Sequence, residues 1–331
     1  MRYSHKSLFL ILGIINSAQA DIQAGLTEHF KKWLSDNKYD TFNFNRDDII
    51  GGSFGGKQSD TDVIKNRPII FVHGNSDVAV GVDDWKIGYT QTIQYLLSHG
   101  YTQQELYATT WGNGNYSLSG LETHDKKRIM YLRPFFEAVL AYTKADKIDV
   151  VTHSMGVTLT RRVIKGGKID IAEEQYDVGT PLTAKVDTFI SLAGGNQGIL
   201  ECAVKLGETW CNSDNGYYPA PPYKNDGPSK YHQLLNSDGI REGDHVFALL
   251  SLKDMRMTSN DPQFGMKTGV FPTVDESYIF STEAYSHLCL RDLTAPLILH
   301  LIENRTMKDF NFDTMFQSGL TCKYPTPYVI Q

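Results

Sequence analysis

Short apolar runs recur along the chain, and stretches with helical spacing separate them. Continuous runs rich in β-branched residues predict buried strands at residues 69–72, 148–151, 186–192 and 246–252, and residues 106–111 form a further candidate. Apolar positions three and four residues apart predict helices at residues 26–34, 85–97, 129–145, 157–164 and 295–302. Strands that alternate with helices predict an α/β protein with a mainly parallel sheet and helices on both faces.

Several segments interrupt this pattern. Pro134 falls within residues 129–145, and it either kinks this helix or lies in its first turn, which would move the start to about Arg133. Residues 47–62, 112–120 and 258–286 are predicted to be mostly loop. Residues 197–244 hold many Tyr and Pro residues but show little periodicity, so we interpret them as an insertion.

The first twenty residues have the layout of a secretory signal peptide. Arg2 and Lys6 are followed by the apolar stretch 8–15, and Ala18-Gln19-Ala20 is a small-residue cleavage site, so we expect cleavage after Ala20. A membrane anchor is the alternative, but it needs about 20 apolar residues. We then expect an N-terminal extension at residues 21–67 and one domain at residues 68–331 that contains the insertion.

The charge balance argues against a nucleic-acid partner. The leader holds two of the 32 basic residues and none of the 38 acidic ones, so the mature chain would carry a net charge of −8. Nucleic-acid binding needs a basic face, which this balance does not favour. The same balance provides no electrostatic attraction to anionic membranes, and no later segment reaches transmembrane length.

Cysteines and glycosylation sequons fit a secreted protein. The four cysteines suit an oxidising compartment and allow three pairings. We favour Cys202–Cys211, which closes a short loop, and Cys289–Cys322, which ties down the tail. No Cys-x-x-Cys or close Cys/His set predicts a metal site. Two Asn-x-Ser/Thr sequons begin at Asn115 and Asn304.

The strand at 148–151 runs directly into Thr152-His153-Ser154-Met155-Gly156, and a predicted helix follows at once. This is the layout of a nucleophile elbow, which exposes Ser154 and frees the Met155 N–H to stabilise an oxyanion. The usual motif has Gly two residues before and after the serine. Thr152 departs from it, so either the turn opens slightly or the neighbouring strand is small there. The alternative is a serine that caps a helix.

Ligands of such sheets bind beyond the carboxyl ends of the strands, where His73, Ser154, Gly194 and Asp254 are expected. A serine nucleophile needs a base, and in this layout the order along the chain is serine, acid, histidine. Four histidines follow Ser154. We favour His287, in a loop near Cys289, because the others lie in the insertion, before a strand, or inside an apolar helix: His232, His245 and His300.

For the acid we favour Asp254, because it follows the strand at 246–252. Its alternative role is that of a turn or capping residue. Asp244 lies at the opposite strand end, and Asp261 and Asp275 remain fallbacks. The second oxyanion donor is expected to be the Asn75 amide, which follows the tight turn at His73 and Gly74; we assign His73 a structural role there.

Four motifs together resemble the class 2 lipases, which include small Bacillus lipases and secreted nematode members. They are Val72-His73-Gly74-Asn75, Thr152-His153-Ser154-Met155-Gly156, Leu252-Lys253-Asp254-Met255 and Ser286-His287-Leu288. The resemblance covers about residues 68–302 and implies the α/β-hydrolase fold. It implies Ser154, Asp254 and His287 as the catalytic triad and the amides of Asn75 and Met155 as the oxyanion hole. It also implies hydrolysis of carboxylic esters, often triacylglycerols, without a cofactor.

We therefore expect a secreted serine ester hydrolase, foremost a triacylglycerol lipase, that acts on a lipid or small ester through an acyl-enzyme. The same triad could instead cleave a thioester, an amide or a phospholipid acyl bond, since specificity lies in the pocket. An inactive hydrolase fold that serves as a secreted binding protein is the alternative from another class. The Trp and Tyr residues of the insertion suggest the hypothesis of a lid that lines an acyl groove or contacts a lipid surface.

Overall fold

The computed structural model describes residues 22–81, 83, 86–205, 207–257 and 267–323. The expected signal peptide with its cleavage site, together with Trp85 and Asp261, lies outside the described residues. Among the described helices, none is long and apolar enough to cross a membrane.

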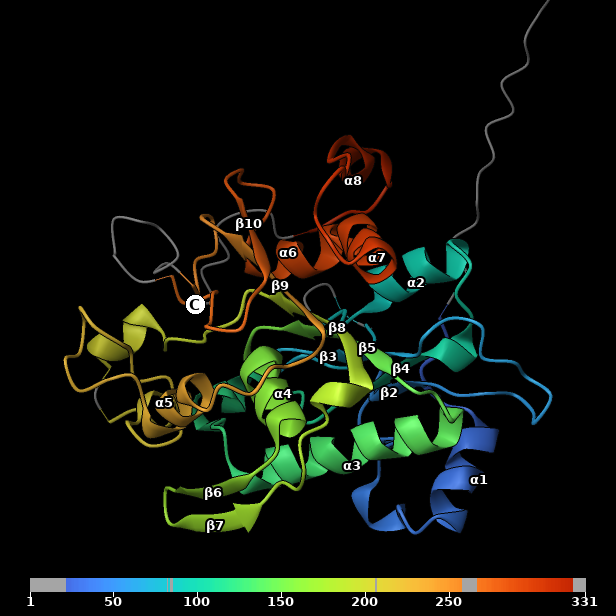
Figure 1. Cartoon of the computed structure of the whole chain (residues 1–331), viewed down its shortest axis with the longest axis horizontal. Coiled ribbons are helices and arrows are strands. Elements are labelled where there is room, and N and C mark those ends of the chain that lie inside the picture. The colour runs from blue at the N-terminus through green and yellow to red at the C-terminus, as the bar shows by residue number, and fades with distance from the viewer. Residues whose placement is uncertain (1–21, 82, 84–85, 206, 258–266, 324–331) are drawn as a thin grey trace, which may run out of the picture.

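The centre of the molecule is an eight-stranded, mostly parallel sheet (Figure 1). Its strands, in spatial order, are β1 (Gly25–Leu26), β2 (Ser53–Gly55), β4 (Leu106–Thr109), β3 (Ile69–Val72), β5 (Ile148–His153), β8 (Val186–Leu192), β9 (His245–Ser251) and β10 (Glu276–Phe280). Among the described strands of this sheet, only β2 and β4 pair in antiparallel fashion. Because parallel strands share one direction, the carboxyl ends of β3, β5, β8 and β9 meet at one edge of the sheet.

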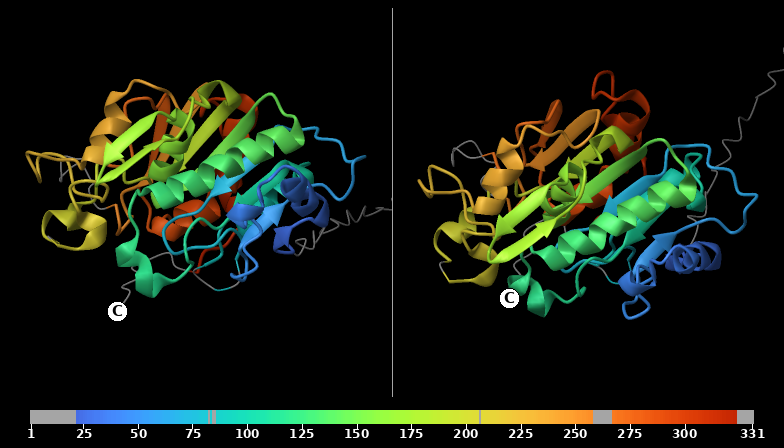
Figure 2. Two further views of the ribbon diagram at one scale, coloured as in Figure 1. Left: turned by 90° about the horizontal axis from the view of Figure 1, so that it is seen from below. Right: turned by 60° about the horizontal axis from the view of Figure 1, so that its bottom comes forward.

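Helices cover both faces of this sheet (Figure 1). One face carries α1 (Glu28–Asp36), α3 (Lys126–Thr143) and α4 (Met155–Lys165), and the other carries α2 (Thr90–Ser98), α6 (His287–Leu293) and α7 (Ala295–Asn304). Figure 2 shows α3 running along the sheet with the N-terminal segment beside it. The fold class predicted from the sequence is therefore confirmed.

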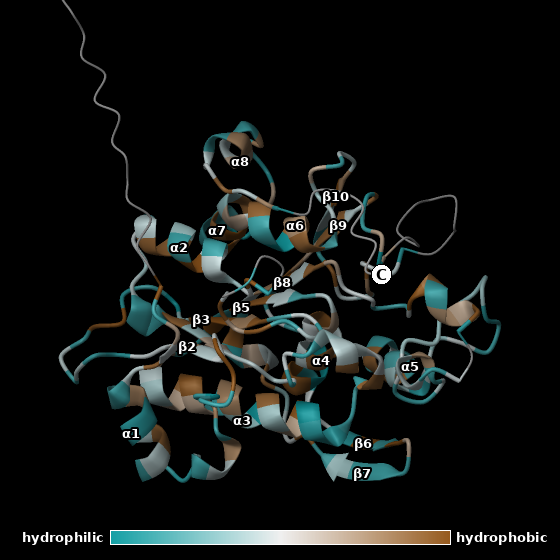
Figure 3. Cartoon of the chain, turned by 180° about the vertical axis from the view of Figure 1, so that it is seen from behind, coloured by the Kyte–Doolittle hydropathy of each residue, from teal (hydrophilic) through white to brown (hydrophobic). Residues whose placement is uncertain are grey.

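Alternate residues of the central strands enter two separate hydrophobic cores. In β3, Ile70 and Val72 belong to the core under α3 and α4, whereas Ile69 and Phe71 belong to the core under α2 and α7. Successive side chains of a strand point to opposite faces, so a strand covered on both sides is mostly apolar along its length. Figure 3 shows this concentration of apolar residues at the centre of the molecule.

Residues 22–67 share the sheet and the core with the rest of the chain. β1 and β2 extend the sheet beyond β4. In α1, Thr27 caps the first turn by accepting a hydrogen bond from the Phe30 amide, and the Phe30 ring stacks on Tyr142 of α3 with centroids 4.2 Å apart. This aromatic packing joins the N-terminal segment to α3.

Several element predictions need correction. α2 begins at Thr90 rather than near residue 85, and Pro134 lies inside α3, which excludes a first-turn position. The segment 258–286, predicted to be mostly loop, contains β10, and the hairpin of β6 (Lys168–Ile171) and β7 (Glu174–Asp177) was not predicted. β10 is an edge strand and the hairpin stands apart from the main sheet, so neither has a continuous apolar run.

The insertion at residues 197–244 is anchored to α4. It contains the 3-10 turns η5 (Leu200–Ala203) and η6 (Thr209–Cys211) and the helix α5 (Lys230–Ser237). Tyr217 and Tyr231 are buried, and the Tyr231 hydroxyl donates to the Thr158 carbonyl of α4 at 2.9 Å. These two tyrosines therefore belong to the core and do not face an open groove.

Two disulfides join the cysteines in the pairing that we favoured. Cys202–Cys211 lies within the insertion, and Cys289–Cys322 connects α6 to the tail that follows the short helix α8 (Asp313–Gln317). The second bridge lies two residues after His287, so it restrains the start of α6.

Candidate active site

Ser154 occupies the sharp turn between β5 and α4. Its backbone has φ 53° and ψ −125°, a left-handed conformation that is strained for any residue with a Cβ. Such strain costs of order 1–3 kcal/mol and is held in place by the surrounding structure. The side chain makes no capping hydrogen bond to α4 within the described residues, so the helix-cap interpretation has no support.

The residues that pack around the turn explain why Gly156 is present and why Thr152 can replace the other glycine of the motif. A Cβ at Gly156 would lie 2.4 Å from the His73 carbonyl oxygen and 2.5 Å from that of Val72, so no larger residue fits. Thr152 pairs in register with Ser191 of β8, which is small, and its hydroxyl donates to the Ile190 carbonyl at 3.0 Å. The small neighbouring residue, one of the two expected solutions, therefore accommodates Thr152.

The structure brings Ser154, His287 and Asp254 into one chain of hydrogen bonds. Nε2 of His287 lies 3.0 Å from the Ser154 hydroxyl oxygen, and Nδ1 lies 2.8 Å from Oδ2 of Asp254. Oδ1 of the buried Asp254 accepts the amides of Arg256 and Met257 at 2.8 and 2.9 Å. Both carboxylate oxygens are thus engaged, which orients the acid toward the imidazole.

His287 differs from its predicted setting. It is the first residue of α6 rather than part of a loop, and the Ser286 hydroxyl accepts the Cys289 amide at 3.4 Å. A Ser cap followed by a short helix is a weak local signal, which explains why the helix start was missed. Because His287 begins a helix, its backbone is held more firmly than it would be in a loop.

The other acids and histidines lie elsewhere. Asp244 pairs with Lys147, and Asp275 binds Arg241 at 2.6 Å and the Val246 amide at 2.8 Å, near the start of β9. His232 is buried in α5, His245 begins β9, and His300 lies on α7. None of these described residues takes part in the hydrogen-bond chain of Ser154.

The two amides expected to form an oxyanion hole flank Ser154. Gly74 packs so closely that a Cβ there would lie 2.9 Å from the Ser154 Cβ. The Asn75 side chain donates to the Ser119 carbonyl at 2.9 Å, which fixes this residue beside the elbow. Within the described part of the chain, the backbone N–H groups of Asn75 and Met155 have no hydrogen-bond acceptor. Both donors are therefore available to a ligand.

His73 supports this turn from behind, in line with the structural role that we assigned to it. Its ring stacks on Trp111 with centroids 5.4 Å apart, and Nε2 accepts the Trp111 amide at 3.3 Å. Nδ1 therefore carries the proton and donates to the Gly74 carbonyl at 2.7 Å. Burial lowers the pKa of His73 to about 4, so the ring is neutral near pH 7.

Sequence reasoning missed the role of His153. It is buried beside His287, and its Nε2 donates to the His287 backbone carbonyl at 2.9 Å. Burial, and then the neighbouring His287, lower the pKa of His153 well below its usual value, so it acts as a neutral donor. The only signal was its place in the elbow motif, which does not reveal a partner far away in the sequence.

Arg291 was also missed. This buried residue of α6 binds Asp77, two residues after Asn75, and it binds Asp292 at 2.7 Å. Burial raises the pKa of Asp292 to about 6, although the Arg291 charge opposes this. Arg291 lies one helical turn after His287, so it connects the helix that carries His287 to the Asn75 turn. Among the described residues, no cluster of His, Cys, Asp or Glu could hold a metal ion.

An eight-stranded sheet with a serine elbow after β5 defines an α/β-hydrolase. The model of the family "Lipase (class 2)" matches residues 66–296, and this chain belongs to that family. The resemblance seen in the sequence is therefore confirmed, and it classes the protein among hydrolases of the lipase and esterase type.

Two solved structures are similar to this chain at low sequence identity. Aspergillus fumigatus lipase B is similar with a TM-score of 0.51 and 12% identity over 84% of this chain, which spans only 61% of that protein. The mature form of Bacillus licheniformis lipase BlEst2 aligns with a TM-score of 0.48 and 13% identity, over 76% of this chain and 97% of that one. A search of curated proteins finds no match.

Proposed function

We propose that this protein is a secreted serine hydrolase of carboxylic esters, with triacylglycerols as its foremost substrates. The observation that carries the proposal is the chain of contacts at the strained elbow: Ser154 to His287 at 3.0 Å and His287 to Asp254 at 2.8 Å. A serine hydroxyl becomes a useful nucleophile when a base lies within hydrogen-bond reach and a third group orients that base.

In the first half-reaction, the Ser154 oxygen attacks the ester carbonyl while Nε2 of His287 accepts the hydroxyl proton. Asp254 stabilises the imidazolium through Nδ1. The carbonyl oxygen becomes an oxyanion, which the amides of Asn75 and Met155 bind. The intermediate then collapses, the C–O bond to the alcohol breaks, and His287 returns its proton to the leaving alkoxide. The products are an acyl-enzyme and a free alcohol.

In the second half-reaction, His287 removes a proton from a water molecule, which attacks the acyl-enzyme. The same two amides stabilise the second oxyanion. The bond between the acyl carbon and Ser154 breaks, Ser154 regains a proton from His287, and the carboxylic acid leaves. His153 and Arg291 act as positioning residues in this scheme, since they contact the backbone of His287 and the Asn75 turn region.

Exposed apolar side chains around the site support a lipid substrate. Leu118 and Leu121 lie on η3 (Tyr116–Leu121) and are 40% and 59% exposed; Met255, beside Asp254, is 59% exposed. η3 contacts both sides of the site, because Ser119 accepts from Asn75 and Tyr116 accepts from Arg256 at 3.0 Å. Exposed apolar residues that cluster around a site favour contact with a lipid surface.

We extend the proposal to the rest of the chain. Cleavage after Ala20 would release a mature protein of residues 21–331, with residues 21–67 preceding the hydrolase domain and residues 197–244 forming its insertion. Asn115 and Asn304 are exposed and would be glycosylated on secretion. The anchoring of the insertion to α4 favours a fixed wall over a freely moving lid. A jump in activity above the solubility limit of the substrate would argue for the lid instead.

The test is hydrolysis of p-nitrophenyl esters of increasing acyl length by the mature protein and by Ser154→Ala. We expect turnover to fall by about a million-fold in the variant, because the whole triad acts as a unit. The acyl-length profile then separates a lipase from a short-chain esterase. If wild type and variant are both folded and equally inert, the protein is a binding protein and the proposed function is wrong.

A further inference from the structure

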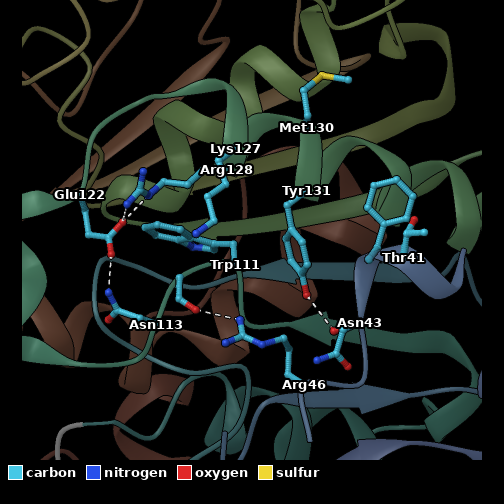
Figure 4. A pocket seen from close by; sticks show the side chains of 12 residues that line it. Thr41, Asn43, Arg46, Trp111, Asn113, Glu122, Lys127, Arg128, Met130 and Tyr131 are labelled. Atoms are coloured by element: carbon cyan, nitrogen blue, oxygen red, sulfur yellow. Dashed lines mark hydrogen bonds and ion pairs between the residues drawn. The ribbon is translucent and has the colours of Figure 1, made fainter. Parts of the chain in front are cut away.

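A hollow lies next to Trp111, whose ring stacks on His73 (Figure 4). Its volume is about 420 Å³, within the range of about 300–1,000 Å³ typical of small-molecule sites. Its walls come from residues 41–46, from the loop after β4 and from the first turns of α3. No step of the proposed reaction uses this hollow.

One wall of the hollow is apolar and largely aromatic. It includes Phe42, Trp111, Met130 and Tyr131. The Tyr131 hydroxyl is engaged by Thr109 at 2.8 Å, which leaves the ring as the surface presented to a ligand. Such rings favour burial of an alkyl or aryl group.

The cations of the hollow are not equivalent. Arg46 binds Asp48 through Nε and Nη2 at 2.8 Å, and Arg128 binds both Glu122 and Asp125. The side chain of Lys127 is exposed and has no hydrogen bond or ion pair with any residue that the structure describes.

The position of Lys127 on α3 also leaves its charge without compensation. It is the second residue of the helix, where the positive end of the helix dipole disfavours a cation. The hollow therefore combines an apolar wall with one positive charge that lacks an anion.

We propose that this hollow binds an amphiphilic carboxylate, with the carboxylate on Lys127 and the alkyl chain against Trp111 and its aromatic neighbours. The ligand class includes the fatty acid that ester hydrolysis would release; this identification of the source rests on the proposed function. The two charged groups would form an ion pair next to the apolar wall.

The site is separate from Ser154 but physically connected to it. Trp111 forms part of the hollow, and its Nε1 donates to the His73 carbonyl at 2.9 Å. His73 immediately precedes Gly74 and Asn75, the proposed oxyanion turn. A ligand in the hollow thus lies one side chain away from that turn, and Trp111 fluorescence should report its arrival.

The experiment is calorimetric titration of decanoate, below its micelle concentration, into the mature protein whose elbow serine has been blocked with an alkyl phosphonate. The block prevents decanoate from binding at Ser154. Lys127→Gln is the test variant. Lys126→Gln is the matched control, since this neighbouring lysine lies over Tyr176 and outside the hollow. Decanol serves as the uncharged ligand.

We expect Lys127→Gln to weaken decanoate binding by about three- to fivefold, because an ion pair at an exposed lysine is lost. Lys126→Gln should bind like wild type, and decanol should bind as weakly to wild type as decanoate does to Lys127→Gln. Equal decanoate affinity in wild type and Lys127→Gln would overturn the proposal. Mass spectrometry of the phosphonate adduct tests the proposed function separately: an unlabelled Ser154 refutes that function, while the comparison of the two lysine variants still decides the second site.

Discussion

Two buried arginines on opposite faces of the sheet make similar contacts but hold different parts of the molecule. Arg291 of α6 binds Asp77 and Asp292, and Arg161 of α4 binds Glu242 at 2.8 Å. Both guanidinium groups are inaccessible to solvent. Arg291 connects the helix of His287 to the Asn75 turn, whereas Arg161 connects the elbow helix to the insertion.

The comparison shows that burial of an ion pair does not by itself identify a functional residue. Each pair is costly to break, because the remaining carboxylate would be buried without a partner. What separates the two arginines is the position of their partners relative to Ser154. Disruption of either one should reduce stability, but only disruption of Arg291 should reduce the turnover of molecules that stay folded.

The largest effect is expected for Arg291→Met. It would leave Asp77 and Asp292 buried without their cation and lower the free energy of unfolding by about 3–5 kcal/mol. Urea unfolding measures this loss, and kcat per phosphonate-titrated site measures the effect on turnover. We expect kcat to fall by more than about tenfold. Unchanged kcat in the folded fraction would remove the proposed positioning role.

A smaller effect is expected for Arg161→Met. Lys165 lies 3.5 Å from Glu242, so the carboxylate would keep one cation, and we expect a loss of about 2 kcal/mol. The methionine preserves part of the packing that the guanidinium makes over Phe271. kcat per titrated site should stay within about twofold of wild type. A fall in kcat as large as that of Arg291→Met would show that Arg161 also influences turnover.

The third effect depends on pH. Burial lowers the pKa of His124 to about 3, against a usual 6.5, and the ring bonds the Asn215 carbonyl of the insertion at 2.8 Å. Below pH 6.5 the unfolded chain binds a proton that the folded chain does not, so His124 reduces stability as the pH falls toward 3, by about 1.4 kcal/mol per pH unit.

His124→Asn keeps a donor for the Asn215 carbonyl but does not titrate. Urea unfolding measures the free energy of unfolding between about pH 6.5 and 4.5. As the pH falls, this free energy should decline less steeply for the variant, by about 1.4 kcal/mol per pH unit. On the other face, two shifts act in opposite directions. The lowered pKa of His73 makes stability fall as the pH falls toward 4, whereas the raised pKa of Asp292 makes stability rise over the same range, so the two effects partly cancel. Parallel pH curves for wild type and His124→Asn would contradict the assignment.

The strands most readily predicted are those buried on both faces. β3, β5 and β8 are buried along their whole length and rich in apolar residues, because helices cover each side. β10 occupies a sheet edge and retains polar residues, so its sequence resembled a loop. The site residues were placed by the same logic, since Ser154, Asp254 and the His73 turn follow strand ends.

Local sequence was sufficient to specify the strand, elbow and helix around Ser154, because neighbouring residues create that geometry. Contacts between distant segments specified the rest: Ser191 beside Thr152, the His287 carbonyl above His153, and the burial of Tyr217 and Tyr231. Each of these joins positions far apart in the chain. Their pairing depends on strand order and helix packing, which no local pattern of residues encodes.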